Sequence, residues 1–456
     1  MPLRALFLLT LTACATAFAD PVDDAVLREM KRTNIPGVSV VVLQNGKIVR
    51  EQGYGLANVE HNVAVTPHTV FQSGSVGKTF TAALVMLLAE DGKLKLDDPI
   101  SRHLPNTPKA WDTITIRHLL THTSGLGDPY AKLDFYKNYS DEELIALEAS
   151  VPVLFAPGDR WAYSNMGYHL LGFICNKAGG KFYGDQLRER IFAPLGMGTR
   201  IISDSAIVPH RAAGYEWIKG ALKNQSWVAP KLNTTADGSL YLTARDLALW
   251  DMALDGNKIL SEKIKLASWT PVKLNDGSTA DYGYGWQLGP VNGHRTISHG
   301  GSWQGFKAGI ERYVDDRLTV IVLANSAAAS PAKLVNLVAR HYVPSLEIKM
   351  AKAIADNEPE VTALVRDVVT QLSRGALASA VLSDKAAAVW TPSRVKSVSE
   401  QMTELKVLQS VELLERKPAG EMRTYRYRFN YADSPLLVMV KFDKASKIDQ
   451  LGLRPE

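Results

Sequence analysis

The stretch from Ser73 to Thr79 reads SGSVGKT and combines residue types that serve two different chemistries. Its Gly77-Lys78-Thr79 ending resembles the end of a phosphate-binding loop. Such a loop also requires a glycine five positions before its Gly-Lys pair, where the backbone approaches the phosphate. That position is occupied by Gln72, so the phosphate-binding interpretation is disfavoured.

The alternative chemistry is a nucleophilic serine with a lysine one helical turn later. Ser75 and Lys78 are three positions apart, so in a helix their side chains lie near each other. The residues that follow are apolar at helical spacing, which predicts a buried helix; they are Phe80, Ala83, Leu84, Leu87 and Leu88. Burial disfavours a charged lysine, so the pKa of Lys78 should fall toward that of a useful general base.

The S-x-x-K spacing alone carries little information. It occurs twice more in the same chain, at Ser330/Lys333 and at Ser393/Lys396. Two of the three matches must therefore be coincidental, and the chemistry depends on partner residues elsewhere in the chain.

A tyrosine and an asparagine two positions apart, Tyr163 and Asn165, are the first candidate partners. They follow a Pro157-Gly158 turn and precede an apolar helical stretch, so packing should fix their position. Both side chains can point to one side of a loop or extended turn. The phenol could transfer a proton, and the amide could hold a substrate carbonyl group. A second Y-x-N match, Tyr136-Lys137-Asn138, lies in a polar segment and is better explained as a solvated loop.

The second candidate partner is His299-Gly300-Gly301, on or beside a strand. Two glycines after a polar residue let a substrate backbone approach a strand edge closely. A His-Gly-Gly sequence taken alone is more often a turn. Lys177-Ala178-Gly179 competes for the same role, but a lysine followed by a glycine is typical of a helix end.

These residues need a fold that brings them together. Residues 37–55 contain two β-rich runs around Asn45-Gly46, which is a strong hairpin signal. Strand patterns return from about Tyr282, and helical patterns fill roughly 75–280. This order predicts an α/β (α+β) fold: one antiparallel sheet made of N- and C-terminal strands, terminal helices on a sheet face, and an inserted helical subdomain.

The domain boundaries follow from changes in pattern. Pro344 to about Glu358 separates the strand-rich part from a remainder with its own helix and alternating strands. We expect a signal peptide over residues 1–19, a main domain over 20–350 and a small α+β domain over 355–456.

The N-terminal residues predict export. Arg4 precedes a short apolar stretch that ends before the small-residue pattern Ala17-Phe18-Ala19, where we expect cleavage. The segment 11–14 also resembles a lipoprotein cleavage box, and a lipid anchor at Cys14 is the alternative. Either form would be periplasmic or secreted. Cys175 then remains as the single cysteine, in an apolar helical stretch where a buried core thiol is expected.

Charge and hydropathy exclude other classes of function. The net charge of +5 is spread along the chain without a basic run, so nucleic acid is not an expected partner. No further stretch is apolar enough to predict a transmembrane helix.

Taken together, the three motifs in this order and spacing resemble those of the penicillin-recognising serine hydrolases. Within that group the chain resembles the class C β-lactamase-like family, which also contains D-Ala-D-Ala carboxypeptidases, D-aminopeptidases and esterases. The resemblance covers about 25–345 and extends to further phrases: ITIRHLLTHTSGL, PGDRWAYSN, APLGM, DGSLYLTARDLALW and YGYGWQL.

The resemblance implies a role for each matching residue. Ser75 would be the nucleophile that forms an acyl-enzyme, and Lys78 would deprotonate Ser75 or tune Tyr163. Tyr163 would act as general base or acid, and Asn165 would bind the acyl-side amide of the substrate.

The third motif would line the site from an edge strand with His299, Gly300 and Gly301. The backbone N–H groups of Ser75 and Ser302 would form the oxyanion hole, where one donor is typically worth about 10²–10³ in rate. The resemblance implies no metal and no cofactor, and a small molecule or short peptide as substrate.

One departure from the family pattern bears on the substrate. Many β-lactamases of the family have a lysine where this chain has His299, and that lysine attracts the carboxylate of the drug. An unperturbed histidine is largely neutral at pH 7. We therefore expect D-amino-acid peptides or simple esters as substrates. A true class C-like β-lactamase, or a catalytically silent penicillin-binding or sensor protein, is the alternative.

Other chemistry-bearing residues have simpler interpretations. His118 and His122 are four apart on an expected helix, a spacing that can bind zinc, but Leu119 replaces the glutamate of an H-E-x-x-H motif. Structural histidines are therefore favoured. Three tryptophans could line the active-site cleft, although tryptophan is by default buried in packing. They are Trp161, Trp286 and Trp303.

Overall fold

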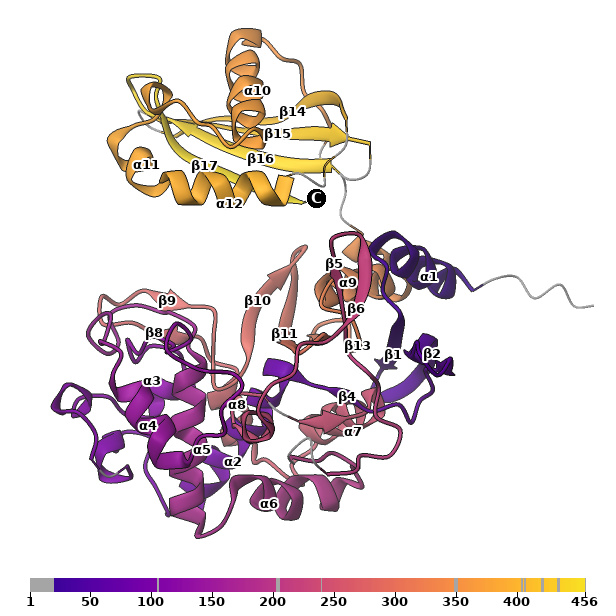
Figure 1. Ribbon diagram of the computed structural model, residues 1–456, viewed down its shortest axis with the longest axis vertical. Coiled ribbons are helices and arrows are strands. Elements are labelled where there is room, and N and C mark those ends of the chain that lie inside the picture. Colours follow the sequence, from indigo (N-terminus) through magenta and orange to yellow (C-terminus); the bar gives the residue numbers. More distant parts are fainter. Residues whose placement is uncertain are drawn as a thin grey trace, which may run out of the picture. The chain divides into compact units, whose positions relative to one another are not determined.

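The computed structural model describes residues 20–104, 106–201, 206–238, 240–347, 352–402, 405, 407–419, 422–432 and 435–455. The expected signal peptide, with the alternative anchor Cys14, lies outside the described residues. The chain divides into two compact units, one that ends at residue 347 and one that begins at residue 348. Figure 1 shows the elements of both units.

The first unit is built on an antiparallel sheet with the strand order β10-β11-β12-β13-β1-β2-β3. The N-terminal hairpin pairs with a strand from the other end of the unit, because Val40 of β1 lies opposite Val322 of β13. The strands are β1 (Gly37–Gln44), β2 (Lys47–Asn58), β3 (Val63–Ala64), β10 (Gln287–Val291), β11 (His294–Trp303), β12 (Phe306–Tyr313) and β13 (Leu318–Ala324).

Helices cover both faces of this sheet. Successive side chains of a strand point to opposite faces, and in β1 they join two different cores. Val40 and Val42 pack in the cluster formed with α1 (Pro21–Thr33) and α9 (Pro331–Tyr342), whereas Val41 belongs to the main core. Figure 1 shows α1 and α9 close together beside the sheet. On the opposite face α7 (Ala244–Asp255) packs against β1 and β13.

The helical insertion occupies the middle of the unit. Its central helix, α2 (Lys78–Glu90), is buried from Lys78 to Leu88 because almost every residue there is apolar. The other helices are α3 (Ile116–Leu120), α4 (Asp141–Ala149), α5 (Asn165–Gly179), α6 (Tyr183–Leu187) and α8 (Glu262–Ser268). The short strands pair as β4 (Phe71–Gln72) with β7 (Tyr241–Leu242), β5 (Tyr215–Ile218) with β6 (Ala221–Asn224), and β8 (Val272–Lys273) with β9 (Thr279–Ala280).

The predicted fold class is confirmed, with one local difference. The strand expected from Tyr282 begins only at Gln287, where β10 starts. Gly285 has φ +75, a left-handed conformation that interrupts an extended strand. Tyr282 and Trp286 are buried around this turn, so their aromatic character reflects packing of a turn rather than pairing in a strand.

The second unit is a small α+β assembly. Its antiparallel sheet has the order β14 (Leu408–Ala419), β15 (Met422–Tyr431), β16 (Pro435–Phe442) and β17 (Ile448–Pro455). Tyr425, Tyr427 and Phe429 alternate along β15 and are buried in one cluster with Val365 and Val369 of α10 (Pro359–Ser373). The remaining helices are α11 (Asp384–Val389) and α12 (Pro392–Met402).

The described residues lack two features. None of their helices combines the length and the apolar character that crossing a membrane requires. Within the same part of the chain, no three His, Cys, Asp or Glu side chains are grouped to hold a metal ion.

Candidate active site

Ser75 lies on a tight turn in front of α2. Residues Gly74–Gly77 form a 3₁₀ turn, and the α-helix begins only at Lys78. The expectation that Ser75 and Lys78 share one α-helix is therefore corrected, although Lys78 still lies one turn further on. The turn is tight because Gly74 has φ +47 and packs against β11: a Cβ atom on Gly74 would lie 2.3 Å from the Ser302 nitrogen.

Lys78 is fully buried and its ammonium nitrogen has three oxygen partners. Nζ lies 3.1 Å from Ser75 Oγ, 2.7 Å from Asn165 Oδ1 and 2.5 Å from the Asp237 carbonyl oxygen. Burial lowers the pKa of Lys78 to about 8, and the carboxylates of Asp237 and Asp128 partly oppose that shift.

The types of these oxygens determine what a neutral Lys78 can do. An amide oxygen and a backbone carbonyl oxygen can only accept, so two N–H groups must point at Asn165 and Asp237. A neutral amine has two N–H groups and one lone pair. The lone pair is then left for Ser75, whose hydroxyl can donate. Deprotonated Lys78 is thereby arranged to accept the Ser75 proton.

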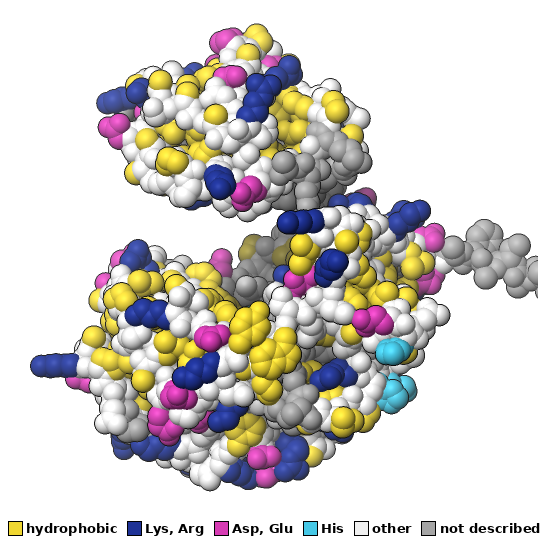
Figure 2. All heavy atoms as spheres, in the orientation of Figure 1, with side chains coloured by type: hydrophobic (Ala, Val, Ile, Leu, Met, Phe, Trp, Pro, Cys, Tyr) yellow, Lys and Arg dark blue, Asp and Glu magenta, His cyan; other side chains and the backbone are white. Residues whose placement is uncertain are grey.

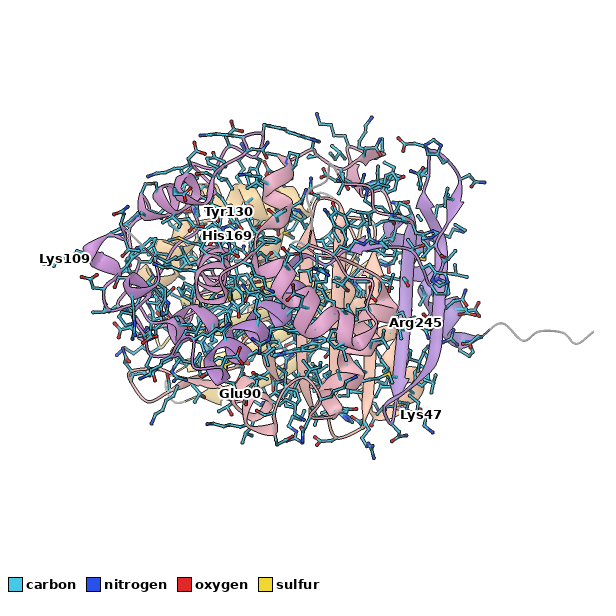
Figure 3. All side chains as sticks on the ribbon, turned by 90° about the horizontal axis from the view of Figure 1, so that it is seen from below. Lys47, Glu90, Lys109, Tyr130, His169 and Arg245 are labelled. Carbon is cyan, nitrogen blue, oxygen red and sulfur yellow. The ribbon has the colours of Figure 1, made fainter. Side chains whose placement is uncertain are left out.

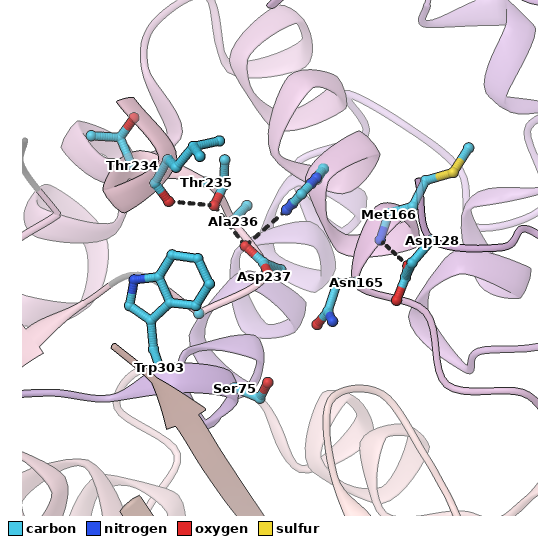
Figure 4. Close-up of polar contacts among 12 residues, drawn as sticks. Ser75, Asp128, Asn165, Met166, Thr234, Thr235, Ala236, Asp237 and Trp303 are labelled. Carbon is cyan, nitrogen blue, oxygen red and sulfur yellow. Dashed lines mark hydrogen bonds and ion pairs between the residues drawn. The ribbon is translucent and has the colours of Figure 1, made fainter. Parts of the chain in front are cut away.

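Asn165 is the first residue of α5, and the start of this helix is fixed by Asp128. The Asp128 carboxylate accepts from Ser164 Oγ at 3.0 Å and from the Met166 N–H at 2.9 Å. Figure 4 shows the second of these contacts beside Asn165. The Asn165 amide nitrogen donates to the Tyr130 hydroxyl at 2.5 Å, so both ends of the amide are held.

Tyr163 is placed against the same lysine. Lys78 Nζ lies 5.0 Å from the centroid of its ring, and Tyr163 lines the same pocket as Ser75. Burial raises the pKa of Tyr163 above its ordinary value of 10.0. The phenol is therefore protonated near neutral pH and can donate a proton.

His122 supports Tyr163 and is not part of a zinc pair. It lies beyond the end of α3 with φ +57, so His118 and His122 do not share a helix as expected. The centroid of the His122 ring lies 4.2 Å from that of Tyr163, with the rings tilted by 34°, and His122 Nδ1 accepts from the Ser164 N–H at 3.2 Å. Burial lowers the pKa of His122 well below its usual value, so the ring is neutral.

His299 is buried and both of its ring nitrogens are occupied. Nδ1 lies 2.6 Å from the Gly300 carbonyl oxygen, so it must carry the proton and donate. Nε2 then accepts from the Tyr282 hydroxyl at 2.9 Å. Burial, with a smaller effect of the Lys78 charge, lowers the pKa of His299 to about 3. The ring is therefore neutral near pH 7.

The third motif does not lie on an edge strand of the sheet. β10 forms that edge, but it pairs with β11 only up to Ser298. Residues 299–303 continue past β10 and pair only with β12, which frees their other side. Only this part of β11 forms the free strand edge that we expected. It contacts the turn that carries Ser75.

The two proposed oxyanion donors lie next to each other. A Cβ atom on Gly301 would lie 2.0 Å from the Ser73 oxygen and 3.0 Å from the Ser75 nitrogen, so only glycine lets β11 approach this closely. Gly300 has more room, because the nearest atom to a Cβ there would be 3.9 Å away. Ser75, Tyr163, His299, Gly300, Gly301 and Ser302 line one pocket.

An aromatic hollow begins at Trp303, the residue after Ser302. Tyr136 and Trp227 line it and stack at 6.0 Å, although both are largely exposed. Figure 2 shows hydrophobic side chains gathered on this face of the first unit. Of the three tryptophans, Trp303 lines this hollow, Trp286 is buried, and Trp161 packs at 6.2 Å from His122.

The sequence did not predict a buried ionic network behind Lys78. His169 on α5 contacts Glu148 Oε1 at 2.8 Å and Asp237 Oδ1 at 3.0 Å. The two carboxylates raise the pKa of His169 to about 10 despite its burial. Thr235 Oγ1 also donates to Asp237, and Figure 4 shows Asp237 facing the same space as Ser75 and Asn165.

A signal for this network was present in the sequence. His169 interrupts an otherwise apolar stretch of α5, and a buried histidine there needs polar partners. Its partners come from α4 and from the segment before β7, so their identity depends on tertiary structure. Figure 3 places His169 and Tyr130 in the helical part of the unit.

In the other S-x-x-K matches the lysine does not face a catalytic serine. Ser330 lines the same pocket as Ser75, but its lysine is engaged elsewhere. Lys333 on α9 pairs with Glu29 at 3.4 Å, and Ser393 and Lys396 lie on α12 of the second unit. Cys175 is buried in α5, where burial raises the pKa of its thiol.

Residues 22–342 match the protein family described as Beta-lactamase. The chain belongs to this family, whose members are serine hydrolases.

Two curated relatives illustrate its range. Penicillin-binding protein 4* of Bacillus subtilis is 33% identical over 307 residues, which is 63% of this chain and 67% of that protein. D-aminopeptidase of Gluconobacter oxydans is 27% identical over 326 residues, which is 69% of this chain and 60% of that protein. The chain thus spans roughly two thirds or less of the length of these relatives.

Two solved structures are also similar to this chain. The D-amino acid amidase of Ochrobactrum anthropi, complexed with L-phenylalanine amide, has a TM-score of 0.61 at 27% identity and covers 72% of this chain and 96% of its own. The octameric penicillin-binding protein homologue from Pyrococcus abyssi has a TM-score of 0.66 at 23% identity, over 95% of this chain and 98% of that chain. The second likeness is one of fold alone.

Proposed function

We propose that this chain hydrolyses amide or ester bonds through an acyl-Ser75 intermediate, with D-amino-acid peptides or simple esters as substrates. The observation that carries the proposal is the set of three contacts of Lys78, which leaves its lone pair for the Ser75 hydroxyl. The D-aminopeptidase and D-amino acid amidase among the similar proteins support the D-amino-acid class.

Acylation would proceed as follows. Ser75 Oγ attacks the substrate carbonyl carbon while Lys78 Nζ takes its proton. The developing oxyanion accepts hydrogen bonds from the backbone N–H groups of Ser75 and Ser302. The bond to the leaving nitrogen or oxygen then breaks, and the protonated Tyr163 supplies the proton that the leaving group needs.

Deacylation would reverse these transfers with water in place of the leaving group. A water molecule loses a proton to the Tyr163 phenolate and attacks the acyl carbon. Ser75 Oγ then leaves and takes back the proton that Lys78 holds. Asn165 is placed to hold the acyl-side amide, since it lies beside Lys78 on the first turn of α5. The reaction consumes one water and needs no further reactant.

The substrate class is tested by a side-by-side comparison of kcat/KM. The panel contains nitrocefin, a short-chain p-nitrophenyl ester, a D-Ala-D-Ala peptide and a D-amino-acid p-nitroanilide. We expect turnover of the ester and of at least one D-residue substrate, with nitrocefin slowest because His299 is neutral. Fastest turnover of nitrocefin would instead support a β-lactamase. No turnover and no acylation would support a silent binding protein.

Export is part of the same proposal. The pattern of residues 1–19 favours a periplasmic or secreted protein. Cell fractionation with N-terminal sequencing of the mature protein tests it. A mature chain that begins at Asp20 would support the expected cleavage, a lipidated Cys14 would support the alternative, and an uncleaved cytoplasmic chain would contradict both.

A further inference from the structure

The pocket beside Ser75 contains a lysine that the family motifs do not account for. Lys307 on β12 lies opposite Ser302 on β11, and directly opposed residues of an antiparallel pair present their side chains on the same face. Lys307 Nζ donates to Ser302 Oγ at 2.9 Å. Both residues line the same pocket as Ser75, Tyr163 and His299.

Lys307 gives the described lining of this pocket its positive charge. Of the described residues that line it, only Lys307 has a side chain that is ionised near pH 7, since His299 is neutral with a pKa of about 3. No carboxylate of the described chain lies within ion-pair distance of Nζ. Lys307 is half-buried, and burial lowers its pKa because no anion compensates the loss of water. A cation in this situation favours an anionic ligand.

We propose that Lys307 and Ser302 bind a carboxylate on the leaving-group side of the substrate, in place of the cation that His299 does not provide. The inference rests on the proposed function and narrows its substrate class to acyl donors whose leaving group carries a carboxylate close to the scissile bond.

The geometry supports both the ligand and its position. When Lys307 donates to Ser302 Oγ, the Ser302 hydroxyl hydrogen and two ammonium hydrogens remain for a ligand, and a carboxylate accepts such bonds strongly. Ser302 also provides the backbone N–H of the proposed oxyanion hole. The carboxylate site and the proposed oxyanion hole therefore share Ser302, which suits the α-carboxylate of a departing amino acid.

The test uses two esters of one N-acylglycine that differ only in the leaving group, 3-carboxyphenol or 3-carbamoylphenol. The ratio of their kcat/KM values, divided by the ratio of their alkaline hydrolysis rates, measures the preference for the carboxylate. We expect wild type to prefer the carboxylate ester and Lys307→Met to reduce this preference about tenfold, the effect of one charge-assisted hydrogen bond. The carbamoyl ester should react at a similar rate in both proteins.

Two further variants serve as controls. Lys307→Arg keeps the charge and should retain most of the preference. Lys47→Met removes an exposed lysine of β2, which is labelled in Figure 3. The strands β13 and β1 separate β2 from β12 in the sheet, so this variant should leave the ratio unchanged. An unchanged ratio in Lys307→Met would overturn the proposal, as would an equal decrease in Lys47→Met.

A binding measurement separates this proposal from the proposed function. Ser75→Ala protein is titrated with 3-hydroxybenzoate and with 3-hydroxybenzamide, and binding is followed by calorimetry or NMR. We expect the benzoate to bind more tightly, and Lys307→Met in the Ser75→Ala background to remove the difference. Absence of hydrolysis in wild type would refute the proposed function alone. Equal binding of the two probes would refute the carboxylate site alone.

Discussion

The Nζ atom of Lys78 lies 3.1 Å from the Oγ atom of Ser75, and its two other partners are oxygens that can only accept. This relationship assigns the two N–H groups of a neutral Lys78 and leaves its lone pair for the serine hydroxyl. It links the burial of α2, which lowers the lysine pKa, to the activation of a nucleophile.

The first prediction concerns the pH dependence of hydrolysis. The pKa of Lys78 is lowered from 10.5 to about 8, and the neutral form is the base. With an uncharged ester, kcat/KM should therefore rise with pH and level off above an apparent pKa of about 8. Lys78→Met should abolish the reaction, whereas Lys333→Met should keep the profile. A rise in kcat/KM with an apparent pKa near 6.5, the ordinary value for histidine, would contradict the assignment of Lys78 as base.

The second prediction concerns the charge of Asp237. Its carboxylate raises the pKa of Lys78, while its backbone carbonyl holds Nζ. Asp237→Asn removes the charge and keeps the carbonyl contact, so the rising limb of kcat/KM should move to lower pH. Asp276→Asn, in an exposed loop, is the matched control. A limb that moves to higher pH, or moves equally in the control, would show that Asp237 does not act on Lys78.

The third prediction concerns stability. His169→Gln removes a buried cation from between Glu148 and Asp237, and breaking a buried ion pair typically costs about 3–5 kcal/mol. Chemical denaturation at pH 7 should show a loss of this size, while His68→Gln on the surface should change little. The folded pKa of His169 lies above its ordinary value of 6.5, so its contribution is complete below that pH. It should disappear as pH rises through about 10.

A constant difference between wild type and His169→Gln from pH 6 to pH 10 would contradict this account. It would indicate that the histidine contributes through packing rather than through its charge.

The fourth prediction compares adjacent glycines of β11. Gly301→Ala places a Cβ atom 2.0 Å from the Ser73 oxygen and must separate the two oxyanion donors. We expect kcat/KM to fall by at least about 10²-fold, the effect of losing one donor. Gly300→Ala meets its nearest atom only at 3.9 Å, so its thermal midpoint should be near wild type. A Gly301→Ala variant whose kcat/KM stays near wild type would show that the close approach at Gly301 is unimportant.

Much of the fold was predictable because it follows local patterns. The Asn45-Gly46 hairpin, the apolar α2 and the alternating residues of β15 each carry their own periodicity. The residues that the motifs single out, Ser75 and Lys78 with Asn165, lie in direct contact in the structure.

The surroundings of the site were not predictable in the same way. Glu148 and Asp237 meet His169 from separate segments, and no periodicity encodes such a meeting. His122 was misplaced on a helix because the left-handed conformation that ends α3 leaves no clear mark in the sequence. Lys307 became relevant only through its register opposite Ser302.

The most direct test of the central claim is intact mass measurement after treatment with a covalent serine probe. The account predicts one adduct per folded chain, located on Ser75 by peptide mapping. The adduct should be absent from Ser75→Ala. It should be retained in Ser393→Ala, which removes the serine of the S-x-x-K match on α12. An adduct that persists in Ser75→Ala, or no adduct on folded wild type, would contradict the claim that Ser75 is the nucleophile.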